Sequence, residues 1–271
     1  MAPVNDDDLL RVIGEYFDAV PRATARVETL GGLHVYDPAG LGTYAARPTL
    51  YRESPVAVDD IEKATARMRE LEVPVFFEWV DDRAPEMAAA AGEAGLRVGR
   101  YPLMVLTGEP RRVDVDDVVI ESVLADDVDR FLAVREAVGV GFMAGGTEVG
   151  DDPESQADDW ADRARTLAER GLIVQFGAYD AETGAALGGG AHIPRPQTGA
   201  SEVTGIGVRP SARRRGIGTA LASAMAEHAR STGIETVFLS AENDAVAAMY
   251  GGVGFRRIGT ACDAEEPGGK D

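Results

Sequence analysis

Cysteine is almost missing from this sequence, and its three histidines are far apart along the chain. With Cys262 alone among 271 residues, the chain can form no internal disulfide and no cysteine-based metal cluster. No apolar run approaches the roughly 18 residues that a membrane-spanning helix needs. The first residues, MAPVNDDDLL, are acidic and unlike the basic-then-apolar layout of a signal peptide. We therefore expect a cytoplasmic protein that uses no metal.

Positive charge is also scarce. The sequence has 27 lysines and arginines against 46 acidic residues, a formal net charge of −19. Nonspecific nucleic-acid binding depends on lysine and arginine neutralising phosphates, so we expect no nucleic-acid partner. Because the sequence has no long apolar run, we also expect no membrane partner. Against this background the cluster Arg213–Arg215 is informative, because it directly precedes the glycines of GIGTALASAMAEHARS, a predicted helix.

The two halves of the chain resemble each other. A shift of 159 residues places Gly95-Leu96 on Gly254-Phe255 and the amphipathic stretch 59–71 on the helix 218–230. The same shift places the loop 213–218 on SPVAVD at 54–59, which has no glycine and no arginine. We expect a duplicated module with domains at 1–112 and 113–262 and a disordered tail at 263–271. The first copy has lost the loop.

The sequence of the second half predicts strands interspersed with helices. Strands are predicted at 117–123, 172–179, 185–194, 201–209, 234–241 and from 255, and helices at 126–138, 153–170, 216–231 and 243–252, with a glycine-rich loop from 139. This order predicts an α/β (α+β) fold in which helices flank a mixed, mostly antiparallel sheet.

The basic loop has the chemistry of an anion site. The first N–H groups of a helix have no intrahelical partner, and glycine lets the backbone approach a ligand closely. Gly216 and Gly218 with three arginines therefore suit a phosphate or pyrophosphate. The loop lacks the lysine of a P-loop and the third glycine of a dinucleotide fingerprint. A solvated basic patch is the alternative.

Three features together resemble the GCN5-related N-acetyltransferase (GNAT) family over about residues 117–262. They are the R-x-x-G-x-G pattern at Arg213, Gly216 and Gly218, the segment from Asn243 to Tyr250, and Gly254-Phe255. Val246 stands where that family usually has alanine. The resemblance implies the family's fold and acetyl-CoA as co-substrate, with a degenerate tandem copy in the N-terminal half. It implies that acetyl-CoA contacts Ile206, Gly207, Val208, Arg213, Arg214, Arg215, Gly216, Ile217, Gly218, Thr219 and Asn243.

The resemblance also suggests two catalytic residues, each with a structural alternative. Tyr250 would protonate the departing thiolate, or it is a core tyrosine. Glu202, on a face shared with Thr204, Ile206 and Val208, would take the proton of the amine, or it is an exposed charge. His192 is a weaker rival for the base. Asn243 can equally be an N-cap.

The acceptor is less defined. Residues 148–162 hold seven acidic residues and no basic one. They form either a solvated helix face or an acidic rim that attracts a cationic amine. In the second case, charge reversal at Asp158 and Asp159 should change the Michaelis constant for the acceptor and its salt dependence. We expect direct acetyl transfer to a primary amine of a small acceptor. A specialised tandem acetyltransferase for a thiol cofactor or an aminoglycoside, or a silent acetyl-CoA-binding module, remains open, and a homodimer is compatible with the sequence.

Overall fold

The computed structural model describes residues 5–37, 45–156 and 160–268. The chain forms two compact units. Unit 1 comprises residues 1–104, 240–244 and 257–271, and unit 2 comprises residues 105–239 and 245–256. No helix of the described ranges combines the length and the apolarity needed to cross a membrane.

The described part of unit 1 contains three α-helices and two groups of strands. The helices are α1 (Asp6–Arg22), α2 (Val58–Glu70) and α3 (Met87–Glu93), and the strands are β1 (Arg26–Leu30), β2 (Leu33–Asp37), β3 (Arg47–Pro48), β4 (Phe76–Val80), β5 (Arg97–Leu106) and β11 (Phe255–Glu265). Strands β1, β2 and β3 form an antiparallel sheet, and β11 lies between β4 and β5. A parallel bridge joins Ala46 to Phe77. Helix α1 begins after Asn5, whose side chain accepts from the Asp8 N–H at 2.8 Å, and its first turn holds three aspartates that favour the positive end of the helix dipole.

Unit 2 contains five consecutive strands in one sheet, in the order β10-β9-β8-β7-β6. Their bounds are β6 (Val118–Val123), β7 (Val174–Asp180), β8 (Ala186–Arg195), β9 (Ala200–Val208) and β10 (Thr236–Ser240). The pairs from β6 to β9 are antiparallel, whereas β9 and β10 are parallel. This is the mixed, mostly antiparallel sheet that the sequence predicts.

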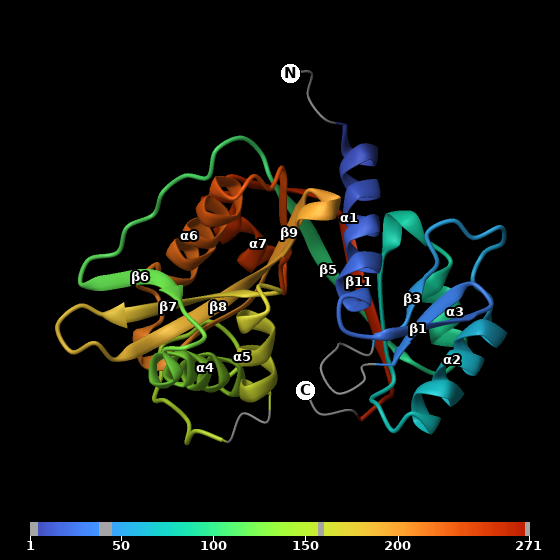
Figure 1. Ribbon diagram of the computed structural model, residues 1–271, viewed down its shortest axis with the longest axis horizontal. Coiled ribbons are helices and arrows are strands. Elements are labelled where there is room, and N and C mark those ends of the chain that lie inside the picture. Colours follow the sequence, from blue (N-terminus) through green and yellow to red (C-terminus); the bar gives the residue numbers. More distant parts are fainter. Residues whose placement is uncertain (1–4, 38–44, 157–159, 269–271) are drawn as a thin grey trace. The chain divides into compact units, whose positions relative to one another are not determined.

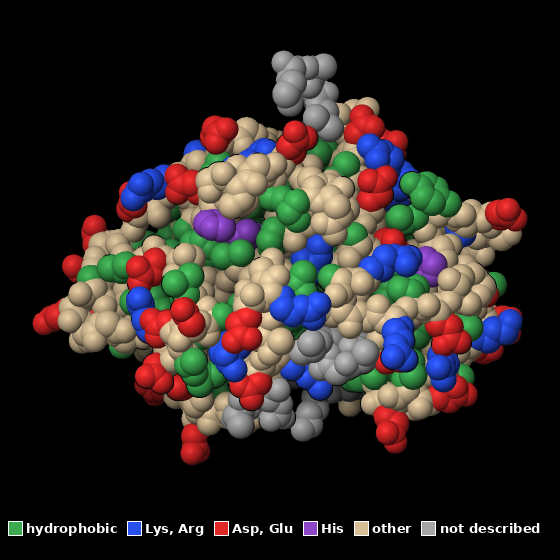
Figure 2. Space-filling model, in the orientation of Figure 1, with side chains coloured by type: hydrophobic (Ala, Val, Ile, Leu, Met, Phe, Trp, Pro, Cys, Tyr) green, Lys and Arg blue, Asp and Glu red, His purple; other side chains and the backbone are tan. Residues whose placement is uncertain are grey.

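Helices cover both faces of this sheet (Figure 1). Helix α6 (Ile217–Ser231) packs on β8 and β9 from one side, and α4 (Val128–Met143) packs on the same strands from the other side with α5 (Ala161–Glu169) beside it. Helix α7 (Asp244–Gly251) precedes β11. Charged side chains are spread over the visible surface, with acidic and basic groups interspersed (Figure 2).

The 159-residue shift holds at the level of whole elements. It places the first residue of α2, Val58, on the first residue of α6, Ile217. It also aligns β4 with β10, α3 with α7 and β5 with β11, and all four pairs of elements agree to within two residues at each end. The repeat therefore extends over four consecutive elements of each half.

Three boundaries differ from the sequence prediction. Helix α4 continues to Met143 through residues placed in the glycine-rich loop, and Gly141 in this last part lets the helix pack closely on the backbone of β9. The helix expected from 153 begins only at Ala161, and residues 151–156 have no regular structure. The tail expected from 263 is partly ordered, since Asp263–Glu265 pair with β4. The helix and strands before residue 50 were not predicted.

The domain boundaries at 112/113 and 262/263 remain predictions about the duplication. The compact units divide elsewhere, because residues after Leu106 bond to the turn between α7 and β11. The Thr107 N–H donates to Gly254 O at 3.1 Å, and the Arg111 N–H donates to Val253 O at 2.8 Å. From Arg257 onward, β11 belongs to unit 1.

Gly141 provides a test of the contact between α4 and β9. A Cβ at Gly141 would lie 2.8 Å from Val208 N and 2.9 Å from Val208 O, whereas a Cβ at Gly139 of the same helix would have no neighbour within 4 Å. Gly141→Ala should lower the free energy of unfolding by about 1–3 kcal/mol through overpacking. The matched control Gly139→Ala should raise it by about 0.5–1 kcal/mol. Denaturant unfolding measures both, and equal effects would contradict the close approach.

Candidate functional site

Strand β9 carries a bulge at its C-terminal end. Gly189 of β8 pairs with Gly207, but Ala191 pairs with Thr204, so β9 has one extra residue between these pairs, and Gly205 has φ +64°. A bulge bends its strand and re-aims the side chains that follow. The glycine inside the strand run TGIGV was the sequence signal for this feature, and the sequence analysis missed it.

The bulge corrects the predicted shared face of Glu202, Thr204, Ile206 and Val208. The Cβ directions of Gly189 and Gly207 point at Val134 and Val138 of α4. Glu202 pairs with Ile193 and Thr204 pairs with Ala191. Ile193 and Ala191 are four and two residues from Gly189 on the same strand, so their side chains share its face. Glu202 and Thr204 therefore lie on the α4 face. Ile206 lies on the opposite face, where its Cγ2 is 3.8 Å from a Cβ position on Gly218 at the start of α6.

The outer edge of β9 opens beyond Glu202. Pairing with β10 covers only Ala200, Ser201 and Glu202, so within the described sheet residues 203–208 have no strand partner on that side. The Arg209 N–H donates to Leu187 O of β8 at 2.9 Å, and because N–H directions alternate along a strand, the Val208 N–H points away from β8 toward the open edge. Backbone groups of Ile206–Val208 therefore border an opening between two parallel strands.

Helix α6 starts at this opening. Arg214 (φ +64°) and Gly216 (φ +85°) are both left-handed and turn the chain into the helix. The Ala220 N–H is the first to bond back, to Gly216 O at 3.0 Å. Among the described residues no backbone acceptor meets the N–H groups of Ile217, Gly218 and Thr219. This helix start is a cradle for an anion.

The three arginines of the loop divide into two kinds. The Arg213 guanidinium donates to four backbone carbonyls: Gly141 O at 2.6 Å, Gly145 O at 2.8 Å, Val208 O at 3.2 Å and Glu148 O at 3.3 Å. Its side chain ties the loop to α4 and to β9, rather than standing free as a basic group. Arg214 and Arg215 are exposed at the mouth of the cradle, and Arg215 reaches Asp116 O at 3.5 Å.

Tyr250 lies near the end of α7. Its side chain is 8% exposed and meets Phe255 edge-on, with ring centroids 6.3 Å apart. The preceding residue, Met249, brings its Cε to 3.9 Å from the Cβ position of Gly218, so this part of α7 lies against the first turn of α6. Asn243 directly precedes α7.

One of the seven acids of 148–162 is bound within unit 2. Asp152 accepts from the Ser211 N–H at 3.0 Å and pairs with Arg209 at 3.5 Å, and Arg209 also reaches Glu136 at 3.1 Å. Asp152 thus supports the loop that leads into α6. Asp158 and Asp159 lie outside the described residues. Within the described ranges no cluster of three or more histidine, cysteine or acidic side chains could hold a metal ion.

His192 is buried on the α6 face, opposite Glu202. Its side chain is fully buried, with Nδ1 2.9 Å from Ser201 Oγ and Nε2 2.9 Å from His228 Nδ1. Burial, and secondarily the neighbouring His228, lowers the pKa of His192 to about 4. With both ring nitrogens engaged and no exposed surface, His192 is a poor base for an incoming amine.

The lowered pKa of His192 predicts a pH-dependent stability. Unfolded histidine titrates near 6.5, so below that pH the unfolded chain takes up a proton that the folded protein excludes. Stability due to neutral His192 is complete above pH 6.5 and is lost as the pH falls toward 4, by roughly 3 kcal/mol at most. Between pH 7.5 and 4.5, the free energy of unfolding measured with denaturant should fall less steeply for His192→Gln than for the parent chain. If the free energy of unfolding of both proteins fell equally with pH, His192 would not be the buried neutral group.

Comparison with known proteins agrees with this geometry. Residues 140–255 match the sequence profile described as the acetyltransferase (GNAT) family. A mycothiol acetyltransferase of Propionibacterium freudenreichii subsp. shermanii is 33% identical over 143 residues, which cover 50% of this chain and 42% of that protein. One of Mycobacteroides abscessus is 36% identical over 135 residues, covering 48% and 42%. The matched region thus spans less than half the length of these curated relatives.

Solved structures show the same fold. A GCN5-related N-acetyltransferase from Kribbella flavida has a TM-score of 0.71 at 19% identity and covers 96% of both chains. Another from Sphaerobacter thermophilus has a TM-score of 0.53 at 19% identity, covering 78% of this chain and 67% of its own. At this identity the likeness concerns the fold alone. Residues 140–255, which include the bulged strand and the start of α6, thus form a domain of the acetyltransferase (GNAT) family.

Proposed function

We propose that unit 2 is an acetyl-CoA-dependent N-acetyltransferase that transfers the acetyl group directly to a primary amine of a small acceptor. The observation that carries the proposal is the start of α6, where the N–H groups of Ile217, Gly218 and Thr219 lack backbone acceptors beside the open edge of β9. These N–H groups fit the pyrophosphate of acetyl-CoA, because its oxygens accept hydrogen bonds and carry the negative charge that a helix start favours.

The loop residues have separate roles in this proposal. Gly216 gives the turn, and Arg214 and Arg215 add positive charge at the mouth. Arg213 is a positioning residue, because its guanidinium is engaged with four carbonyls. The edge of β9 at Ile206, Gly207 and Val208 would hold the pantetheine arm through its backbone groups. The Val208 N–H, directed away from β8, would stabilise the oxyanion.

Two side chains would move protons. Glu202 lies on the α4 face of β9 ahead of the bulge, and we assign to it the removal of the amine proton, directly or through water, since only a neutral amine can attack a thioester. Tyr250, on the helix that lies against the first turn of α6, would give its proton to the departing thiolate. Asn243 would contact the cofactor ahead of α7. The attack forms the C–N bond of the amide and breaks the C–S bond of the thioester.

The acceptor is defined more narrowly by the relatives than by the site. Two relatives of this chain carry the name mycothiol acetyltransferase, which favours an acceptor from the biosynthesis of a thiol cofactor as a second, more specific candidate. A cationic acceptor drawn in by the acids of 148–162 is the broader candidate. The alternative is a regulatory module that binds acetyl-CoA without catalysing a reaction. We favour the enzyme because Tyr250 is present beside the loop.

Tyr250→Phe tests the proposal. The protein should release CoA thiol from acetyl-CoA in the presence of a suitable amine, found by a screen with a thiol reagent. Tyr250→Phe should lower kcat by about a hundredfold or more, since it removes the proton donor, while acetyl-CoA binding by calorimetry stays unchanged.

Tyr179→Phe is the matched control. Tyr179 is also a buried tyrosine of unit 2, and the Arg130 guanidinium lies over its ring, 4.2 Å from the centroid. This variant should keep the parent kcat. Absence of turnover with every amine, combined with tight acetyl-CoA binding, would favour the silent binding module.

A further inference from the structure

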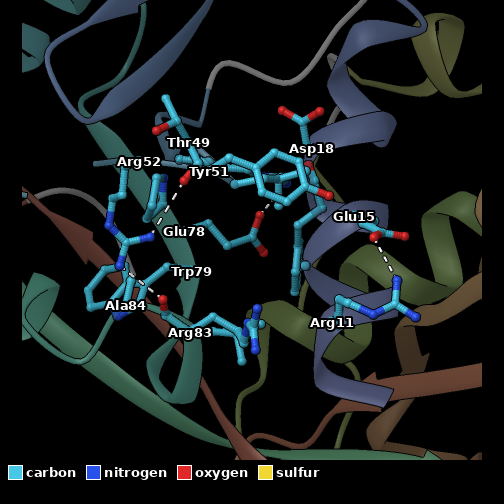
Figure 3. A pocket seen from close by; sticks show the side chains of 16 residues that line it. Arg11, Glu15, Asp18, Thr49, Tyr51, Arg52, Glu78, Trp79, Arg83 and Ala84 are labelled. Carbon is cyan, nitrogen blue, oxygen red and sulfur yellow. Dashed lines mark hydrogen bonds and ion pairs between the residues drawn. The ribbon is translucent and has the colours of Figure 1, made fainter. Parts of the chain in front are cut away.

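Each unit contains a strand that, within the described sheets, pairs on one side only: β4 with β11 in unit 1, and β6 with β7 in unit 2. The outer side of β4 is covered by the protein itself. The Ala46 N–H donates to Phe76 O at 2.8 Å, and the Glu78 N–H donates to Ala46 O at 3.0 Å. Side chains of α1 and of the segment after β3 gather around Glu78 and Trp79 beside this bridge (Figure 3). The edge of β4 is therefore closed.

The free side of β6 follows from the directions of the backbone groups. In β7 the Asp180 N–H donates to Ala185 O at 2.9 Å, on the side of β8. Because these directions alternate along a strand, Tyr179 bonds toward β6, where its partner is Val119. Val119 and every second residue after it therefore bond to β7. The residues between them direct their N–H and C=O groups to the free side.

Three residues of β6 form this free edge: Val118, Ile120 and Ser122. The Val118 N–H turns back to Val115 O at 3.3 Å, which agrees with its direction away from β7. No other strand of the described ranges pairs on this side, and β6 is the outermost strand of the unit 2 sheet (Figure 1). The Val118 C=O and the backbone groups of Ile120 and Ser122 are thus available to one more strand.

The edge of β6 lacks the features that keep other edges from pairing. Proteins protect free edges with proline, lysine, bulges or covering elements. The strand VVIESV has no proline, lysine or glycine, and its pairing with β7 runs without a register shift. Its one charged side chain, Glu121, is paired with Arg130 of α4. Val119 is 45% exposed, and Leu124, which directly follows the strand, is 68% exposed. These properties favour a partner strand with apolar side chains.

A second copy of β6 meets this requirement. A closed two-fold pairing of the same edge is antiparallel, and two such registers overlap five of the six residues of the strand. The register centred on Glu121 places two Glu121 carboxylates opposite each other, which destabilises a strand pair. The register centred on Ile120 places Ile120 opposite Ile120, Val118 opposite Ser122, and Val119 opposite Glu121. In this register no two charged side chains of the strand lie opposite each other.

We propose that the chain forms a two-fold symmetric dimer in which β6 pairs antiparallel with β6 of a second copy, in the register centred on Ile120. The two Ile120 residues exchange N–H to C=O hydrogen bonds, and the Ser122 N–H of each copy donates to Val118 O of the other. The Ile120 side chains meet at the axis as a pair of β-branched residues. Strands β7 and β8 separate this edge from β9, so the dimer forms at a distance from the proposed acetyl site.

Ser122 supplies a matched pair of variants. Its side chain is exposed and its N–H faces the free side, so Ser122→Pro removes a donor of the dimer without removing a bond to β7. Sedimentation of the parent chain at rising micromolar concentrations should give twice the mass of one chain. Ser122→Pro should sediment as a monomer with an unchanged circular dichroism spectrum, whereas Ser122→Ala, which keeps the N–H, should remain dimeric.

A disulfide test reports on the register. Val119 of one copy lies opposite Glu121 of the other at a position without hydrogen bonds, where Cα atoms are about 4.5 Å apart, within reach of a disulfide. An oxidised mixture of Val119→Cys chains and Glu121→Cys chains should give a disulfide-linked dimer on a non-reducing gel. Neither variant should cross-link alone, because its own two cysteines are too far apart. The native Cys262 is 1% exposed and should not react.

Three results would overturn the proposal. One is a parent chain that stays monomeric over the micromolar range. Another is an undiminished dimer in folded Ser122→Pro. The third is a failure of the mixed cysteine variants to cross-link, or a cross-link in either variant alone, which would show a different pairing. None of these measurements involves acetyl-CoA, so the dimer and the proposed acetyl transfer are tested separately.

Discussion

The hydrogen bonds of the Arg213 guanidinium hold together the part of the chain on which the rest of the site depends. They connect the loop before α6 to Gly141 at the end of α4, to Gly145 and Glu148 in the following segment, and to Val208 at the end of β9. A guanidinium has five donors in a fixed plane, so it can fix several backbone segments at once. The first turn of α6 is thereby held beside the open edge of β9 with its N–H groups directed outward.

The two halves show how the same succession of elements can acquire different chemistry. Helices α2 and α6 begin at equivalent positions of the repeat. Just before α2, the Ala57 N–H donates to Asp60 and the Val56 N–H donates to Glu86, so two carboxylates lie at this helix start. At the start of α6 no such carboxylate bonds to the backbone, and the N–H groups of Ile217, Gly218 and Thr219 have no backbone acceptor in the described chain. One helix start is therefore closed by the protein's own carboxylates, and the other suits a phosphate. This contrast explains why we place one acetyl-CoA site in each chain.

Much of this arrangement could be predicted from the sequence, because its signals are local. Glycines at 216 and 218 mark a tight helix start, and the repeat of apolar and glycine positions at a fixed shift gives the order of the elements. The bulge at Gly205 was missed, since a strand pattern assumes unbroken alternation, and Glu202 and Ile206 consequently lie on opposite faces. The role of Arg213 depends on carbonyls about 65–72 residues away in the chain, which no local pattern reveals.

The stoichiometry of acetyl-CoA binding tests the central claim most directly. Isothermal titration calorimetry on the full chain should give one acetyl-CoA per chain. The double variant Gly216→Asp and Gly218→Asp should bind none, because it places carboxylates where the pyrophosphate would accept from the first turn of α6. Two molecules per chain, or unchanged affinity in the double variant, would contradict a single anion cradle at this helix start.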